Sequence, residues 1–129
     1  MRHDVLSDVL HNLKIAKDSK QSEIIAKPIS KLTCKVLDIL KKEKYIENYE
    51  IIKDKKGDSA KIKLTNQIND IGAIKPRFPV TLDEYEKYEK RYLPAKDFGR
   101  LILSTPKGLM THIDAKEKKL GGVLIAYVY

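Results

Sequence analysis

The most informative segment of the chain is Ser104-Thr105-Pro106-Lys107-Gly108, which leads through a short polar segment to the apolar run Gly122-Val123-Leu124-Ile125-Ala126-Tyr127-Val128-Tyr129. Pro106 fixes the φ angle that the first central position of a type I turn needs, and Gly108 suits the fourth. The sequence therefore predicts a tight turn followed by a buried terminal strand. Two hydroxyls and one ammonium beside a glycine let a sugar or a phosphate approach the backbone, so the turn is also a candidate RNA contact.

Elements around this turn also have recognisable signals. Residues 100–104 have strand character, and Thr111 with Asp114 resembles a weak capping box that starts a short helix. The pair Gly121-Gly122 can reverse the chain into the last strand, where Tyr127 and Tyr129 share one face. This half of the chain is therefore expected to be mainly β, with short helices.

A helix is predicted to open near Thr81 and to stop at Leu93-Pro94. Its three tyrosines lie at helical spacing, so we expect them to pack in a core rather than to stack on bases: they are Tyr85, Tyr88 and Tyr92. Residues 66–72 carry no strong periodicity, and two prolines, Pro76 and Pro79, follow, which places a boundary near residues 66–73. We therefore predict two lobes, 1–68 and 69–129, and the turn that is the candidate RNA contact lies in the second.

The first lobe alternates helices and strands. Apolar residues recur at helical spacing over residues 4–16, and 23–27 reads as a short strand stopped by Pro28. Ser30 is placed to cap a second helix. Residues 45–53 and 60–65 have strand character and flank a polar, glycine-containing hairpin signal. The order is helix, strand, helix, hairpin, which predicts an α+β fold of two small lobes.

Composition restricts the function classes. With 129 residues, of which 42% are hydrophobic, the chain can bury one core or two small ones. It has 26 Lys and Arg against 18 Asp and Glu, a formal charge of +8, which favours a polyanionic partner. The single Cys34 excludes an internal disulfide framework and fits a reducing cytoplasm, and neither a signal peptide nor a membrane span is apparent.

Catalytic and metal-binding patterns are absent from the sequence. His3, His11 and His112 form no His-x-x-x-His motif, and no phosphate-binding Gly-x-x-x-x-Gly-Lys run occurs. We therefore predict no enzymatic activity, no metal and no cofactor. A small hydrolase that pairs Ser104 or Thr105 with His112 stays open as an alternative, as does a free RNA-binding regulator.

Several motifs quoted above resemble the ribosomal protein S8 family of the small subunit. The turn, the Gly-Gly pair and the terminal strand match nearly word for word. The segments Ile74-Lys75-Pro76-Arg77-Phe78-Pro79-Val80 and Lys90-Arg91-Tyr92-Leu93-Pro94-Ala95-Lys96-Asp97-Phe98-Gly99 are similar to the archaeal and eukaryotic branch of that family. Asp4, Asp8, Leu10 and Pro28-Ile29-Ser30-Lys31-Leu32 resemble its N-terminal motifs. The resemblance covers almost the whole chain.

The resemblance implies a cytoplasmic ribosomal protein that binds a central-domain helix of small-subunit ribosomal RNA (rRNA), scaffolds its assembly and lies beside other small-subunit proteins. The RNA-binding residues that it implies are Ser104, Thr105, Pro106, Lys107, Gly108, Gly121, Gly122, Ser30, Lys31, Asn12 and Lys14. Lys31 also stands at a predicted helix start, where backbone amides favour phosphate. The sequence departs from many relatives at Pro106, where Ser is usual, and at Val5, Asn12 and Ile15 of the first helix.

Overall fold

The computed structural model describes residues 5–27, 29–65, 67–75, 77–95 and 98–129. Predictions that involve the remaining positions lie outside these residues: they concern His3, Asp4, Pro28, Asn66, Pro76, Lys96 and Asp97. The chain divides into two compact units, residues 1–71 and 72–129. Both units combine helices with antiparallel sheets, so the predicted α+β class is confirmed. The assignment of RNA binding to the second lobe stays a prediction.

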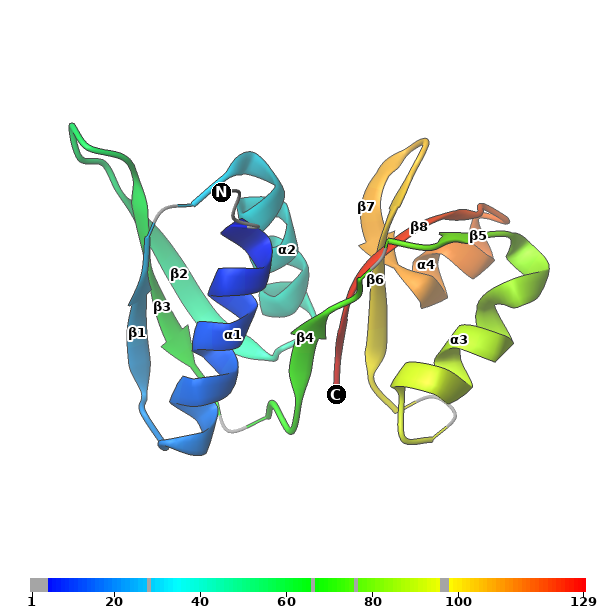
Figure 1. Cartoon of the computed structure of the whole chain (residues 1–129), viewed down its shortest axis with the longest axis horizontal. Coiled ribbons are helices and arrows are strands. Elements are labelled where there is room, and N and C mark those ends of the chain that lie inside the picture. The colour runs from blue at the N-terminus through cyan, green and yellow to red at the C-terminus, as the bar shows by residue number, and fades with distance from the viewer. Residues whose placement is uncertain (1–4, 28, 66, 76, 96–97) are drawn as a thin grey trace. The chain divides into compact units, whose positions relative to one another are not determined.

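The N-terminal unit is a three-stranded antiparallel sheet with two helices, α1 and α2 (Figure 1). Its elements, in chain order, are α1 (Val5–Asp18), β1 (Glu23–Ala26), α2 (Lys31–Lys42), β2 (Ile46–Ile52) and β3 (Ser59–Leu64). The strand order is β1-β3-β2, with β2 and β3 forming the hairpin. The predicted order of helix, strand, helix and hairpin is therefore confirmed.

Helix periodicity explains the core of this unit. Every third or fourth residue of α1 from Leu6 to Ala16 is buried, which leaves a polar face in solvent. α2 begins where predicted, because the Ser30 hydroxyl oxygen accepts a hydrogen bond from the Thr33 amide at 3.2 Å. The buried apolar side chains of the unit are Leu6, Val9, Leu10, Leu13, Ala16, Ala26, Val36, Leu37, Leu40, Ile46, Ala60, Ile62, Ile68 and Ile71.

The C-terminal unit is built around a five-stranded antiparallel sheet. Its elements are β4 (Ile71–Ala73), β5 (Pro79–Val80), a 3₁₀ turn (Leu82–Glu84), α3 (Tyr85–Tyr92), β6 (Arg100–Thr105), β7 (Gly108–Thr111), α4 (His112–Glu117) and β8 (Gly122–Val128). The main path through the sheet is β4-β8-β6-β7, and β5 also pairs with β8. The terminal strand is thus central in the sheet, which explains its apolar sequence.

Three strands of this sheet were not predicted, namely β4, β5 and β7. They contain three, two and four residues, too few for an alternating pattern to show. Each is held by pairing with a longer strand: β4 and β5 pair with β8, and β7 pairs with β6. β4 and β5 depend on a partner distant in sequence, whereas β7 depends on the tight turn that folds it back onto β6, and none of the three rests on its own propensity alone.

The tyrosines take the core positions that their spacing predicts. Tyr85 and Tyr88 are buried, and the Tyr85 hydroxyl donates to the Leu120 carbonyl at 2.6 Å. Tyr127 and Tyr129 lie on the same face of β8, with ring centroids 6.3 Å apart, whereas Val128 is buried on the other face. These aromatic rings pack against other residues of the protein, as predicted.

Candidate nucleic-acid interface

The predicted turn is a two-residue hairpin loop between β6 and β7. Thr105 and Gly108 are the last paired residues, and the two loop residues, Pro106 and Lys107, are exposed. Gly108 has a φ of +114°, which residues with a side chain rarely adopt. A Cβ atom placed on Gly108 would have no heavy atom within 4 Å, so this backbone is open to an approaching molecule.

Thr105 stabilises the turn from within. Only 8% of the residue is exposed, its hydroxyl donates to the Gly108 carbonyl at 2.8 Å, and the same oxygen accepts from the Lys107 amide at 3.2 Å. The Thr105 hydroxyl, which was predicted to contact RNA, is therefore hydrogen-bonded inside the loop. Its contribution to a ligand site is to hold Lys107 and Gly108 in place.

Ser104 and the Gly-Gly pair come together beside this hairpin. A Cβ atom on Gly122 would lie 2.3 Å from the Ser104 carbonyl oxygen, and one on Gly121 would lie 2.6 Å from the Val80 carbonyl oxygen. The close approach that these glycines permit is between strands of the protein itself. Their predicted contact with RNA stays a prediction, and the structure gives them a packing role that the sequence analysis did not include.

In the N-terminal unit, Ser30 and Lys31 lie at the start of α2. The Ser30 side chain caps the helix and is hydrogen-bonded to the Thr33 hydroxyl at 3.0 Å, and Lys31 is exposed. The first turn contains no acidic residue, so the positive end of the helix dipole and the Lys31 ammonium add together. This arrangement suits an anion.

The two remaining predicted residues lie on α1 and differ in their surroundings. Lys14 is ion-paired with Asp70, with 3.1 Å between Nζ and Oδ1. Asn12 is exposed and lines a groove between α1 and β1. The structure thus brings together the hairpin with Ser104 and Gly122, and separately Ser30 with Lys31, whereas the Lys14 ammonium already has a carboxylate partner.

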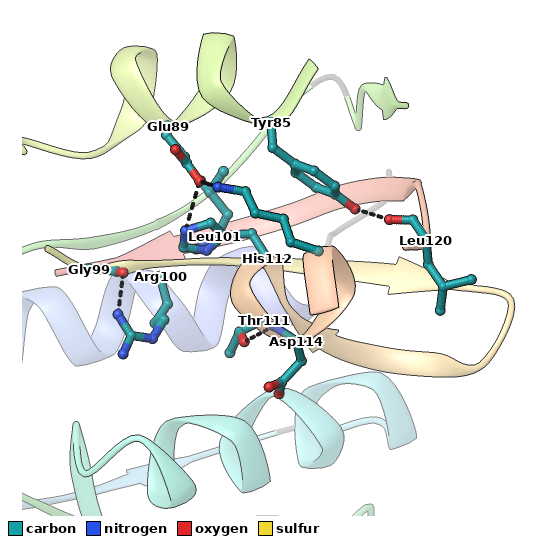
Figure 2. A network of polar contacts seen from close by, with 10 residues as sticks. Tyr85, Glu89, Gly99, Arg100, Leu101, Thr111, His112, Asp114 and Leu120 are labelled. Atoms are coloured by element: carbon teal, nitrogen blue, oxygen red, sulfur yellow. Dashed lines mark hydrogen bonds and ion pairs between the residues drawn. The ribbon is translucent and has the colours of Figure 1, made fainter. Parts of the chain in front are cut away.

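His112 belongs to a buried network that sequence reasoning missed. Its Nδ1 accepts a hydrogen bond from the Leu101 amide at 3.0 Å, and its Nε2 lies 3.2 Å from Glu89 Oε1 (Figure 2). Lys116 is also paired with Glu89. Both imidazole nitrogens therefore have partners within the core, and the Thr105 hydroxyl is bonded inside the turn. The hydrolytic pair of Thr105 with His112 is not supported by this geometry.

Burial lowers the pKa of His112 from 6.5 to about 4, against the opposing effect of Glu89. The unfolded chain therefore binds one more proton than the folded protein between these values, and stability is lost as the pH falls through this window. We expect a loss of about 2–3 kcal/mol between pH 6.5 and pH 4 from this group. Denaturant unfolding at a series of pH values measures it.

The matched variant for that titration is His112→Asn, whose side-chain oxygen can accept the Leu101 amide but does not titrate. The variant should show a flatter pH profile over the same window. An unchanged profile would assign the acid sensitivity to other groups.

Comparison with known proteins decides the family. The model of the family described as ribosomal protein S8 matches residues 4–129. The chain belongs to the ribosomal protein S8 family. The predicted family is therefore confirmed, and the relatives below, all archaeal, agree with the predicted branch.

Curated S8 relatives match over the full length. The chain is 50% identical over 129 residues to the small ribosomal subunit protein uS8 of Nanoarchaeum equitans and 50% identical to that of Thermoplasma volcanium, with 100% of each chain covered. It is 46% identical to the uS8 protein of Archaeoglobus fulgidus over the same span. Members of the S8 family are structural ribosomal proteins, which supports the expectation that the chain is not an enzyme.

Two structural findings bear on other functions of an S8 protein. Among the described residues, no group of three or more His, Cys, Asp or Glu side chains could hold a metal ion. In the same part of the chain, no helix has the length and apolar composition needed to cross a membrane.

The polar network of Glu89, His112 and Lys116 was not predicted, because its residues form no recognisable motif in the sequence. Glu89 lies 23 positions before His112, and the pairing depends on α3 and α4 meeting over β6. The Thr111 cap, whose oxygen accepts from the Asp114 amide at 3.3 Å, was predicted and starts α4. That cap was the one local feature that placed His112 at the beginning of a helix.

Proposed function

We propose that this chain is a structural component of the small ribosomal subunit in the cytoplasm, where it binds the central domain of small-subunit rRNA directly and scaffolds its assembly. The observation that carries the proposal is the β6–β7 turn of an S8 family member. It presents an exposed lysine beside Gly108, where an added Cβ atom would meet no heavy atom within 4 Å apart from its chain neighbours. Other small-subunit proteins are the expected neighbours.

The proposed mechanism is recognition of RNA shape without chemistry. Lys107 neutralises a phosphate, and the open backbone at Gly108 allows a sugar or phosphate to come close. Thr105 keeps this surface in one conformation before the RNA arrives, which lowers the ordering cost of binding. Ser104 at the base of the hairpin adds a half-buried hydroxyl.

The start of α2 is the proposed second contact. Lys31 is exposed at its first position, and no carboxylate in the first turn opposes a phosphate there. A contact at this point would be electrostatic and insensitive to base sequence. Specificity would come from the shaped hairpin of the C-terminal unit.

A panel of central-domain rRNA fragments, titrated with the full chain at several salt concentrations, tests the proposal. We expect one fragment to bind far more tightly than the others, with an affinity that falls as salt rises. Equal, weak binding to all fragments would contradict a direct and specific role. A messenger complex without association with ribosomal subunits would favour the regulator alternative.

Replacing the loop lysine tests its role directly. Lys107→Ala should weaken binding to the preferred fragment about fivefold at physiological salt and reduce the salt slope by about one, because one phosphate neutralisation is lost. Lys55→Ala is the matched control, since Lys55 is an exposed lysine in the β2–β3 hairpin of the other unit. Identical titrations for the two variants would reject the assignment of Lys107.

A further inference from the structure

The sheet of the N-terminal unit has an open edge at β1. The strand order is β1-β3-β2, and Figure 1 shows β1 along the border of its unit. The Leu64 amide donates to the Ser22 carbonyl at 2.8 Å, and the register continues that pairing to Ile24↔Ile62 and Ala26↔Ala60. Bonded and non-bonded pairs alternate in an antiparallel ladder, so the backbone groups of Glu23 and Ile25 point away from β3.

A groove of about 540 Å³ runs beside this edge. It is lined by Asn12, Ile15 and Ala16 of α1, Gln21 of the connection, and Glu23, Ile24 and Ile25 of β1. Ile25 is 63% exposed and Ile15 is 48% exposed, the two highest values among large hydrophobic side chains of the described residues. An open strand edge therefore lies next to an apolar surface.

The charge of the lining distinguishes between classes of partner. Among the described residues, the lining contains no lysine or arginine and one carboxylate, Glu23, which is ion-paired with Lys61 of β3 at 3.5 Å between Oε1 and Nζ, although the whole chain carries a formal charge of +8. The Lys61 ammonium is paired with Glu23, and the described lining adds no other cation for a phosphate, so RNA is disfavoured here. β1 also contains neither lysine nor proline, the residues with which proteins protect exposed edges against pairing.

We propose that this groove, the β1 groove, docks an extended apolar segment of a neighbouring ribosomal protein, which adds a fourth strand to the sheet. Its backbone pairs with Glu23 and Ile25, and its alternate side chains contact Ile15 and Ile24 on the helix side and Ile25 on the other. This inference rests on the proposed ribosomal function.

Site-specific photocrosslinking tests the occupant. The full chain with p-benzoylphenylalanine in place of Ile25 is assembled into small ribosomal subunits, irradiated, and analysed by mass spectrometry. We expect crosslinks to one ribosomal protein, confined to a short segment of alternating apolar residues. Crosslinks to rRNA, crosslinks to a second copy of this chain, or no crosslink would each overturn the proposal.

The variant Ile25→Lys gives the β1 groove a charge of the kind that blocks edge pairing. We expect the crosslinked neighbour to be depleted about 30-fold from subunits that contain this variant, a loss of hot-spot size. An RNA occupant would instead be held more tightly, because lysine adds a phosphate contact. Ile52→Lys is the matched control, since Ile52 is 42% exposed on β2 at the opposite edge of the sheet, and it should leave the neighbour in place.

The same two variants separate this inference from the proposed function. Both should bind the preferred rRNA fragment like the unmodified chain, because Ile25 is largely exposed and contributes no phosphate contact. Normal RNA binding with an undiminished neighbour would overturn the β1 groove alone. Loss of fragment binding by the unmodified chain would instead overturn the ribosomal function on which it rests.

Discussion

Gly108→Val should weaken binding to the preferred rRNA fragment by roughly 30-fold or more, the largest effect expected from any substitution in the turn. A Cβ atom at this position meets no protein atom within 4 Å, so the added side chain projects into the space where the RNA is proposed to lie. The φ of +114° is also strained for a β-branched residue, at a cost of about 1–3 kcal/mol in stability. Fragment titration and denaturant unfolding measure the two effects separately.

Gly57 provides the control for backbone strain. It lies in the β2–β3 hairpin, has a φ of +126°, and likewise has no heavy atom within 4 Å of a Cβ placed on it. Gly57→Val should therefore lose similar stability without a comparable loss of RNA affinity. Equal affinities for the two folded variants would show that the open side of Gly108 does not face RNA.

The second large effect concerns the Gly-Gly pair. Gly122→Ala should destabilise the chain by at least about 3 kcal/mol, because a Cβ there would lie 2.3 Å from the Ser104 carbonyl oxygen and force β8 away from β6. The neighbouring atom is backbone and cannot move without disturbing the sheet. Urea unfolding, followed by circular dichroism, gives the free energy of unfolding directly.

Val123→Ala is the matched control, because Val123 is the next residue of β8 and is 36% exposed. It should cost less than about 1 kcal/mol. If Gly122→Ala were as mild as this control, the backbones of β6 and β8 would have to separate at little cost. The packing role assigned to Gly122 would then be wrong.

Local signals predicted the larger part of the fold. α1 and α2 have apolar residues at helical spacing over 14 and 12 residues, and the Ser30 cap fixes where α2 begins. The β2–β3 hairpin and the β6–β7 turn contain glycine where positive φ is needed, at Gly57 and Gly108. Such features are readable because each depends on residues within a few positions of one another.

The candidate site was predicted only in part. The turn, its exposed lysine and its glycine follow from turn chemistry, and the S8 family follows from the motifs. The inward bonding of the Thr105 hydroxyl does not follow, because a threonine before a turn can point either way. The strand-to-strand role of Gly122 depends on β8 lying against β6, a pairing between segments about 20 residues apart.

Residue patterns were enough to predict the α+β class, the long helices and hairpins, the basic charge and the S8 family, because periodicity, turn residues and net charge are local or additive properties. The folded structure was needed to show that β8 is central in its sheet, that His112 is held in the core between Leu101 and Glu89, and that β1 has an open edge beside an apolar groove. These features depend on which distant segments meet. Burial and strand pairing in the folded chain determine which segments come into contact, and no single stretch of residues specifies these contacts.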